Sequence, residues 1–426
     1  MTEIKPFKGL LYNKYNIGGD MSGVMAPPYD VIPPGMQKDL YAASDYNVVR
    51  LILGKDEQGD GDTDNKYKRA GRLLREWQEK EILKRDDSEC LYVYSQEYEI
   101  KGRKCRRLGF IGLLKIGDKG KDNLLPHEYT LTKPKEDRLN LIKEVRANLS
   151  PIFALYNDDT GEIRDILEGC AGAGTPEVEA ISEGVKNELW RLSSDEGKNR
   201  IRSILSDRKL FIADGHHRYE VARTYRDIRR KEAGYDGSAD HVMVYFTDMA
   251  DSENLTVLAT HRAVRSVSPT KRDDIEGKLR TYFDVTPCGD LEELTGLLGR
   301  SGKDHCFGVV LADGLYFLTP KDVRALEELI GQDKSPQWKK LDVSVLHSAV
   351  LEKILSIKSV EGNITYLRDA EDAVSLVTDE KYDVAFILNP TPVWQLRDVA
   401  ELGEMMPQKS TYFYPKLLTG LVINKF

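Results

Sequence analysis

The spacing of hydrophobic and polar positions predicts a chain of alternating helices and strands. Between Asn65 and Lys80, apolar residues recur every three or four positions, which is the repeat of one helix face. Residues 90–99 alternate between two faces and residues 106–114 form a second apolar run, so we expect a hairpin with Gly102 in its turn. Further strands are expected at 47–54, 150–156, 210–213, 243–246, 255–262, 306–318 and 383–388.

The helices expected from the same pattern indicate at least two regions. Residues 125–138 form a polar, proline-punctuated loop, and residues 160–207 are rich in helix. Helices are expected at about 136–148, directly after residue 213, and at about 270–283, 291–299 and 322–331. The mixture predicts an α/β or α+β fold with mixed sheets. We divide it into a catalytic and nucleotide-binding region at 1–266 and an additional α/β region at 267–426, from which 406–416 could return to the site.

Composition limits the kind of protein and its partners. With 426 residues, 40% of them hydrophobic and 31% charged, the chain is long enough for two or three folded domains at about 100–200 residues each. A net charge of −8 disfavours nucleic acid and anionic membranes as general partners. The five cysteines include no C-x-x-C pair, so neither a disulfide framework nor a zinc site is expected. Because neither a signal peptide nor a run of about 20 apolar residues is found, we expect a cytoplasmic protein.

The strongest chemical signal is the turn Asp214-Gly215-His216-His217-Arg218, which joins an expected strand to an expected helix. A helix N-terminus offers unsatisfied backbone N–H groups to an anion, and Gly215 lets a phosphate approach them. Arg218 offers a planar fork for phosphate oxygens, and the two histidines can donate to phosphate or move a proton. Asp214 could hold Mg²⁺ or accept a hydroxyl proton. The simpler interpretation is that Asp214 caps the helix, but five such residues in one turn favour a site.

Two other segments carry candidate residues. The loop at 127–138 holds His127, Glu128, Thr130, Lys133, Lys135, Asp137 and Arg138, a mixture that suits binding of phosphate or metal and the movement of one proton. Its alternative is a solvated loop whose charges pair among themselves. In the segment 406–416, anions could contact Lys409, Ser410, Thr411 and Lys416. The aromatic residues 412–414 could line a ring pocket or simply pack into the core. Asp30, in a Pro-Pro-Tyr-Asp turn, is a weaker candidate for a metal ligand.

Several longer motifs carry a family resemblance. They are A-P-P-Y-D-V-I at 26–32, P-H-E-Y-T at 126–130, D-R-L at 137–139, N-L-S-P-I-F at 148–153, A-D-G-H-H-R-Y-E at 213–220, T-H-R at 260–262 and M-P-Q-K-S-T-Y-F-Y-P-K at 406–416. Together they resemble a domain-of-unknown-function family of bacteria and archaea, over nearly the whole chain. The name of that family carries no activity.

A shorter motif, D-G-H-H-R-Y-E-V-A, resembles the phosphate-binding helix start of the ParB/sulfiredoxin-like superfamily. That superfamily includes partition proteins that bind CTP, sulfiredoxins that bind ATP, and free-serine kinases. The resemblance implies that residues 215–218 cradle nucleotide phosphates and that Asp214 lies near the transferred group. It also implies ATP or ADP with Mg²⁺ as cofactors. The region from 267 onward has no role in this resemblance.

The leading hypothesis is a nucleotide-dependent phosphotransferase that acts on a small hydroxylated metabolite, with free L-serine as the first guess. The residues expected to be catalytic are Asp214, Glu128, His127 and His216, and the base is Asp214 or Glu128. The nucleotide is expected to bind Gly215, His217, Arg218, Lys133, Arg138, Lys409, Ser410, Thr411 and Lys416, and the metal Asp214 and Asp30. Two alternatives stay open: a nucleotide-binding regulatory or switch protein, and a metal-dependent phosphohydrolase.

Overall fold

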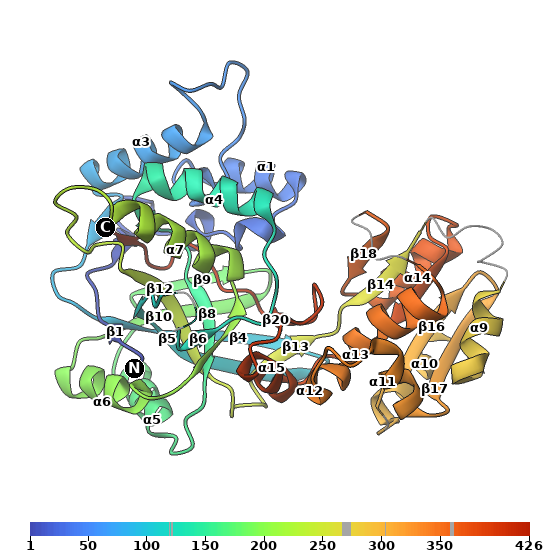
Figure 1. Ribbon diagram of the computed structural model, residues 1–426. Coiled ribbons are helices and arrows are strands. Elements are labelled where there is room, and N and C mark those ends of the chain that lie inside the picture. Colours follow the sequence, from blue (N-terminus) through green and yellow to red (C-terminus); the bar gives the residue numbers. More distant parts are fainter. Residues whose placement is uncertain (119, 121, 266–273, 303, 358–361) are drawn as a thin grey trace. The chain divides into compact units, whose positions relative to one another are not determined.

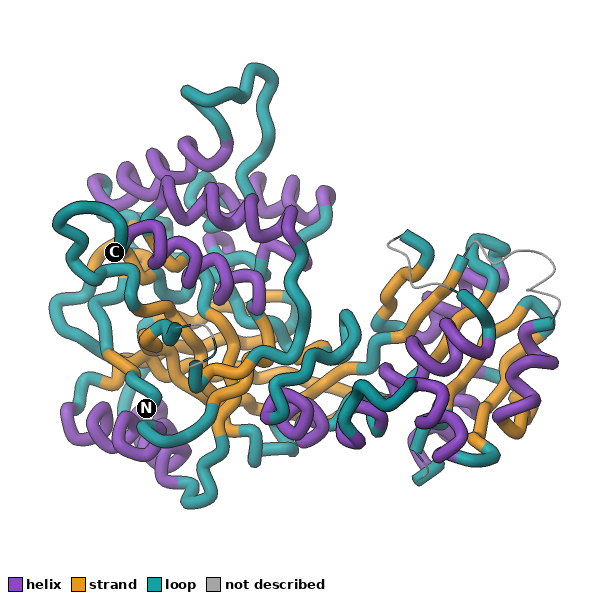
Figure 2. Tube along the Cα trace, viewed as in Figure 1, coloured by secondary structure: helices purple, strands orange, loops and turns teal. Residues whose placement is uncertain are grey.

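The protein consists of two compact units, and neither is a single stretch of chain. Unit 1 comprises residues 1–125, 130–256 and 415–426, and unit 2 comprises residues 126–129 and 257–414. The computed structural model describes residues 1–118, 120, 122–265, 274–302, 304–357 and 362–426 (Figures 1 and 2). The expected boundary at 266/267 and the start of the helix expected at 270–283 lie outside the described residues.

Unit 1 is built on a nine-stranded sheet in which parallel and antiparallel neighbours alternate on one side. The pairs β6–β11 and β8–β12 are parallel, and the other neighbours are antiparallel. The strands follow in the order β6 (Leu124–Leu125), β11 (Leu210–Asp214), β8 (Ile152–Tyr156), β12 (His241–Asp248), β5 (Arg103–Lys115), β4 (Leu91–Ile100), β10 (Val185–Leu192) and β9 (Val178–Ser182), with β1 (Ile4–Lys5) beside β5. The expected mixed sheet is therefore confirmed.

Two short pairs of strands complete the sheets of unit 1. β2 (Leu10–Tyr12) pairs with β3 (Leu83–Arg85), and β7 (Ala147–Asn148) pairs with β21 (Asn424–Lys425). The second pair ties the C-terminal segment 415–426 to a strand made far earlier in the chain. Isolated bridges from Ile423 to Leu10 and from Thr419 to Ala26 fix the same segment.

Helices cover the sheet of unit 1, with α3, α4 and α7 above the strands in Figure 1 and α5 and α6 below them. On α7, Tyr219 and Ala222 join the core that the sheet forms with α5 and α6, while Val221 and Tyr225 contact Ile142 of α4. The helices are η1 (Ser22–Val24), η2 (Tyr29–Val31), α1 (Pro34–Ala43), α2 (Val49–Ile52), α3 (Lys66–Glu79), α4 (Thr132–Val145), α5 (Glu162–Gly172), α6 (Asp195–Leu205) and α7 (His216–Arg229).

Unit 2 contains a six-stranded sheet in which all neighbours are antiparallel. Its order is β15 (Phe283–Cys288), β17 (Gly314–Pro320), β16 (Phe307–Leu311), β19 (Val384–Ile387), β14 (His261–Val264) and β18 (Ile364–Leu367). The core packs Leu294 and Leu298 together with Ala373 and Val377 against this sheet. A further pair joins β13 (Thr256–Leu258) to β20 (Tyr412–Tyr414).

The helices of unit 2 include one of unusual type. In η3 (Val345–Ile354) the turns are wide, of the π class, and the helix ends with Leu355 N donating to Val350 O at 2.9 Å. The remaining helices are α9 (Ile275–Tyr282), α10 (Leu291–Arg300), α11 (Val323–Ile330), α12 (Pro336–Lys339), α13 (Asp342–Ser344), α14 (Ala370–Thr378) and α15 (Val393–Glu401).

Three expected elements are wrong, each for a local reason. The apolar run at 47–54 forms helix α2 instead of a strand, because Asn47 Oδ1 accepts from Val49 N at 2.9 Å and starts a helical turn. Most residues of the run are buried, so its apolar positions show no repeat that would distinguish a helix from a strand. The loop at 125–138 ends early, because α4 begins at Thr132. The region 160–207 contains the hairpin β9–β10 between its two helices.

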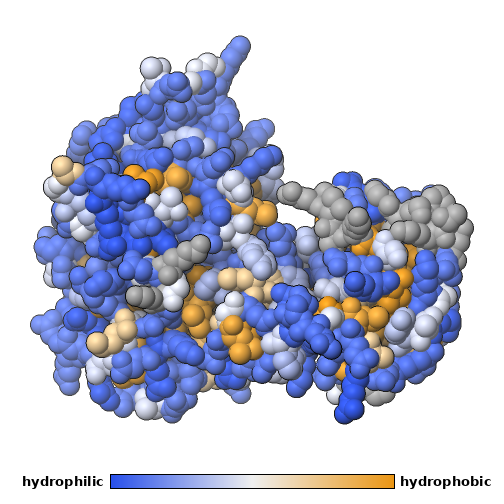
Figure 3. Space-filling view, viewed as in Figure 1, coloured by the Kyte–Doolittle hydropathy of each residue, from blue (hydrophilic) through white to orange (hydrophobic). Residues whose placement is uncertain are grey.

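Other expectations are confirmed, including the turn at Gly102. Lys101 and Gly102 both have positive φ, 49° and 76°, as a two-residue hairpin turn of the primed type requires. Within the described part of the chain, every helix is too short or too polar to span a bilayer. Figure 3 shows a face that is mostly hydrophilic, with hydrophobic residues in separate patches.

Candidate functional site

The turn between β11 and α7 has the geometry of an anion-binding helix start. β11 ends at Asp214 and α7 begins at His216, as the sequence predicts. Gly215 between them has φ 95°, and a Cβ at this position would lie 3.0 Å from Arg218 Nε. A side chain is thus disfavoured both by the left-handed backbone and by the contact with Arg218. No side chain caps the N-terminus of α7, so its first turn faces the site with the positive end of the helix dipole.

Asp214 is held between two cations. Its Oδ2 accepts from Arg218 Nη2 at 2.5 Å, and its Oδ1 accepts from Lys416 Nζ. Arg218 also donates through Nη1 to the carbonyl of Pro151. The side chains of Asp214, Arg218 and Lys416 are only 13–16% exposed, so solvent screens these pairs weakly. Burial raises the pKa of Asp214, but Lys416 and Arg218 outweigh it and hold that pKa well below its usual range.

Lys416 is positioned by a buried polar network that sequence reasoning missed. Gln96 Nε2 donates to Lys416 O at 3.0 Å, and Arg107 Nη2 donates to Pro415 O and to Gln96 Oε1. Tyr94 OH accepts from Leu418 N at 3.1 Å and donates to Asn187 Oδ1 at 2.6 Å. The available signal was that Gln96 and Arg107 are polar residues inside strands that are otherwise buried.

The two histidines of the turn differ in their roles. His216 is buried, and burial lowers its pKa to about 3 although Asp214 acts in the opposite direction. The ring is therefore neutral at pH 7. His217 Nε2 accepts from Leu131 N at 2.9 Å, which places the proton of a neutral ring on Nδ1. His217 thus anchors the segment that leads into α4.

The start of α4 is attached to α7 by a second contact. Glu220 Oε2 accepts from Thr130 Oγ1 at 2.6 Å and from Lys135 Nζ at 3.0 Å. Lys133, also expected to bind the nucleotide, is exposed in the first turn of α4. Lys133 and Lys135 lie on a helix rather than in a loop. The directions in which their side chains leave the backbone are therefore set by α4.

Arg138 and Tyr29 form one wall of a small pocket next to Arg218. Arg138 donates to Ile52 O at 2.7 Å and to Asp137 Oδ2 at 2.8 Å, and its Cζ lies 3.9 Å from the centre of the Tyr29 ring. The pocket has a volume of about 70 Å³, and its other walls are mainly apolar side chains of α4, α7 and β8. Burial and the charge of Asp30 raise the pKa of Tyr29, while Arg138 and Arg218 lower it. The Tyr29 hydroxyl therefore lies within reach of charges of both signs.

Asp30 differs from the other carboxylates of this site. It is exposed in η2, and among the described residues no cation forms an ion pair with it. Asp214 has both oxygens occupied, whereas the oxygens of Asp30 are accessible to a ligand. Among the described residues, no three His, Cys, Asp or Glu side chains lie close enough together to hold a metal ion.

The remaining predicted residues lie in unit 2 and form their own cluster. His127 Nε2 is 3.1 Å from Thr411 Oγ1, and Lys409 N donates to Glu128 Oε1 at 3.0 Å. Ser410 Oγ donates to Pro407 O at 2.5 Å. Residues 127–128 and 409–411, far apart in sequence, are thus brought together. The predicted residues therefore form one group in unit 1 around Asp214 and another in unit 2 around Glu128.

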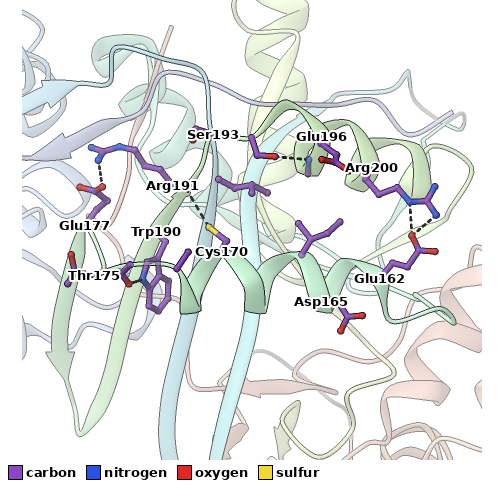
Figure 4. Close-up of a pocket in the computed structure, with 16 residues that line it drawn as sticks. Glu162, Asp165, Cys170, Thr175, Glu177, Trp190, Arg191, Ser193, Glu196 and Arg200 are labelled. Carbon is purple, nitrogen blue, oxygen red and sulfur yellow. Dashed lines mark hydrogen bonds and ion pairs between the residues drawn. The ribbon is translucent and has the colours of Figure 1, made fainter.

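A second pocket of unit 1, larger than the one next to Arg218, is lined by none of the predicted residues (Figure 4). It has a volume of about 820 Å³ and lies between α5, β10 and α6. Its arginines are both in ion pairs, Arg200 with Glu162 and Arg191 with Glu177. Three of its acidic residues, Glu162, Asp165 and Glu196, lie in the first turns of α5 and α6, where helix dipoles favour them. Size alone therefore does not identify the site.

The fold is mixed α/β, and the turn at 214–218 places a charged cluster at an uncapped helix start. The family model described as "Protein of unknown function (DUF1015)" matches residues 4–344, and the chain belongs to this family. The family resemblance expected from the motifs is thus confirmed. Among curated proteins, none matches the chain.

Solved structures give distant matches. A conserved hypothetical protein from Pyrococcus furiosus is 14% identical, with a TM-score of 0.34, and the match covers 70% of this chain and 89% of that chain. A free serine kinase in complex with AMP is 15% identical, with a TM-score of 0.34 and coverage of 68% and 84%. A C-terminally truncated SbnI from Staphylococcus aureus is 12% identical, with a TM-score of 0.35 and coverage of 72% and 85%.

Proposed function

We propose that the protein is a nucleotide-dependent phosphotransferase that acts on a small hydroxylated metabolite, with free L-serine as the first candidate acceptor. The observation that carries this proposal is the Asp214 carboxylate held between Lys416 and Arg218 at the uncapped start of α7. Phosphoryl transfer depends on positioned cations and backbone donors around the phosphates rather than on covalent chemistry. This turn supplies both kinds of group in a partly buried setting.

In the proposed site, the phosphates bind at the turn 215–218. The N–H groups of the first turn of α7 and the Arg218 fork contact phosphate oxygens. Lys416 can donate to the same oxygens while it keeps its contact with Asp214, because an ammonium group has three N–H donors. Asp214 stays ionised, since its pKa is held well below the usual range, and keeps both cations in place. Asp214 is therefore a positioning residue rather than the base.

The acceptor hydroxyl needs a carboxylate with an unoccupied oxygen, and Asp30 meets that condition. In this assignment, Asp30 takes the proton while the acceptor oxygen bonds to the transferred phosphorus, and the bond from that phosphorus to the remaining nucleotide phosphate breaks, so that the shortened nucleotide leaves. Magnesium requires few protein ligands when a nucleotide supplies phosphate oxygens, so Asp30 is also the residue that would hold it. When bound, Mg²⁺ would neutralise charge on the phosphates. The other predicted carboxylate, Glu128, is engaged by the Lys409 amide, and we assign it to holding that loop.

The test is isothermal titration with ATP, ADP and CTP in the presence of Mg²⁺, on the wild type and on Arg218→Ala. The matched control is Arg230→Ala, an exposed arginine near the end of the same helix, about 18 Å along its axis. We expect nucleotide binding in the wild type and the control, and its loss in Arg218→Ala. Equal binding by all three proteins would remove the phosphates from this turn.

An acceptor screen follows, with L-serine as the first compound. Transfer of phosphate to an acceptor, lost in Asp30→Asn, supports the phosphotransferase. Release of inorganic phosphate at the same rate without any acceptor would instead indicate a phosphohydrolase. Nucleotide binding without turnover of any kind would favour the regulatory protein.

A further inference from the structure

Arg262 in β14 is a buried charge whose partners are neutral. Its side chain is 1% exposed. It donates through Nη1 to Thr260 O and through Nη2 to Lys409 O at 3.0 Å. Among the described residues, no acceptor lies within hydrogen-bond distance of Nε, and no carboxylate acts on the guanidinium. Burying a cation without a counter-charge has a high cost in free energy, which a negative charge nearby would offset.

The histidines around Arg262 do not compensate its charge. Burial, together with the charge of Arg262, lowers the pKa of His261 to about 4 and that of His347 to about 3. Both rings are neutral at pH 7, and His261 Nδ1 accepts from Leu388 N at 3.2 Å. Glu371 acts only on His261, whose side chain points to the opposite face of β14 from Arg262.

Two tyrosines and a second arginine share the face of the sheet on which Arg262 lies. Arg262 and Tyr366 are cross-strand partners in β14 and β18, and Arg262 Cζ lies 5.5 Å from the centre of the Tyr366 ring. Arg368 follows two positions after Tyr366, is exposed, and has its Cζ 3.7 Å from the centre of the Tyr412 ring. This face thus combines aromatic rings with two guanidinium groups.

The loop 407–410 adds a third cation, Lys409, whose backbone is held in place. Lys409 has φ 56°, a left-handed conformation that costs a non-glycine residue about 1–2 kcal/mol. Its backbone is held on both sides, with its amide donating to Glu128 Oε1 and its carbonyl accepting from Arg262 Nη2. The side chain of Lys409 is exposed, and no ion pair with it is found among the described residues. Strain that the surroundings maintain in this way is typical of functional loops.

We propose that unit 2 carries an oxyanion site of its own, in which Lys409 and Arg368 bind a phosphate group and the buried Arg262 supplies positive charge beneath them. Among the described residues, no carboxylate forms an ion pair with any of the three cations, and Glu128 contacts the loop through the Lys409 amide. A phosphate dianion supplies two negative charges to such a cluster, whereas a carboxylate supplies one. The ligand class is therefore inorganic phosphate or a phosphate monoester. This site does not depend on the function proposed for the turn at 214–218.

The experiment is isothermal titration of the full chain with inorganic phosphate at constant ionic strength. The variants are Lys409→Ala, Arg368→Ala and their double variant, and Lys381→Ala is the control, an exposed lysine of the same unit. We expect each single variant to weaken binding at the unit 2 site about tenfold and the double variant to abolish it. The control should bind as the wild type does.

Arg218→Ala separates this proposal from the function proposed for unit 1. If phosphate binding at the unit 2 site persists in Arg218→Ala and disappears in the double variant, the unit 2 site stands even if the kinase proposal fails. If the double variant binds phosphate with the same affinity and stoichiometry as the wild type, the proposal is overturned. Thermal unfolding without phosphate checks that the double variant is folded. We expect it to unfold at the temperature of the wild type, because both changes are at exposed positions.

Discussion

The Lys416 ammonium donates to the Asp214 carboxylate across 202 residues of sequence. Arg218, only one helical turn after Asp214, completes the arrangement from the other side. The carboxylate therefore neutralises one local and one distant cation. Its removal would leave both cations partly buried and without a counter-charge.

We expect Asp214→Asn to lose about 3–5 kcal/mol of the free energy of unfolding, as is typical when one partner of a buried ion pair is removed. Urea unfolding measures this loss. Added phosphate should restore more stability to the variant than to the wild type, because it supplies the missing negative charge. Asp122→Asn is the control, since Asp122 is similarly buried, and among the described residues its ion pair is with one cation, Arg223. A variant as stable as the wild type would contradict the role given to Asp214.

Gly215→Ala tests the shape of the turn. A left-handed alanine costs about 1–2 kcal/mol, and its Cβ would also press on Arg218 at 3.0 Å. Gly234 has φ 75°, and a Cβ there would meet no atom within 4 Å. We therefore expect both alanine variants to lose stability in thermal unfolding, and only Gly215→Ala to lose nucleotide binding as well. Equal binding by the two variants would show that contact with Arg218 is irrelevant.

Acid should destabilise the protein through His216. Its pKa is about 3 in the native state against an ordinary value of 6.5, so between these pH values the unfolded chain takes up a proton that the native state does not. Stability therefore falls as the pH decreases below 6.5, by up to about 1.4 kcal/mol per pH unit for one such group. His261 and His347 act with the same sign.

Urea unfolding of His216→Gln at pH 7, 6 and 5 measures this contribution. We expect the free energy of unfolding of His216→Gln to fall less steeply with decreasing pH than that of the wild type. The difference in slope corresponds to the uptake of about one proton. Parallel curves for the two proteins would mean that His216 takes up its proton equally in both states.

Gln96 should influence nucleotide binding through Lys416. Gln96→Ala removes the donor to Lys416 O and leaves Arg107 without one acceptor, which we expect to cost about 1–3 kcal/mol of stability. Nucleotide affinity should fall in Gln96→Ala and in Lys416→Ala, and the double variant should bind no more weakly than Lys416→Ala alone. Fully additive losses would show that Gln96 acts elsewhere. Glu99→Ala, at an exposed position of the same strand, provides the control.

The local part of the site could be predicted because its signals are contiguous. An apolar run, a glycine and a helical repeat predict the strand, the turn and the helix between 210 and 229, and Asp214 and Arg218 lie one turn apart. Lys416 is among the candidates predicted from the segment 406–416, but its pairing with Asp214 could not be assigned, since nothing near Asp214 in sequence indicates which distant residue pairs with it. Arg107 and Gln96 were missed for the same reason, because their contacts are with backbone atoms of a distant segment.

The segment 125–138 shows a different limit of sequence reasoning. Its residues form one polar run, yet Glu128 belongs to unit 2 and Thr130 to unit 1. Composition gives no indication of that division, because both halves are charged. The prediction of a strand at 47–54 was wrong, because a short and mostly buried apolar run is compatible with both a strand and a helix.

The return of the chain to unit 1 has a consequence for synthesis. Residues 415–426 pair with Leu10, Ala26 and β7, but they leave the ribosome only after residues 257–414 have been made. At a synthesis rate of about 5–20 residues per second, the part of unit 1 already made lacks its C-terminal segment for on the order of ten seconds. Leu10, Ala26 and β7 are without their partners during that time. During that interval Asp214 faces Arg218 without Lys416. Any property of the site that depends on the pairing of Lys416 with Asp214 would therefore begin only after residue 416 has been made.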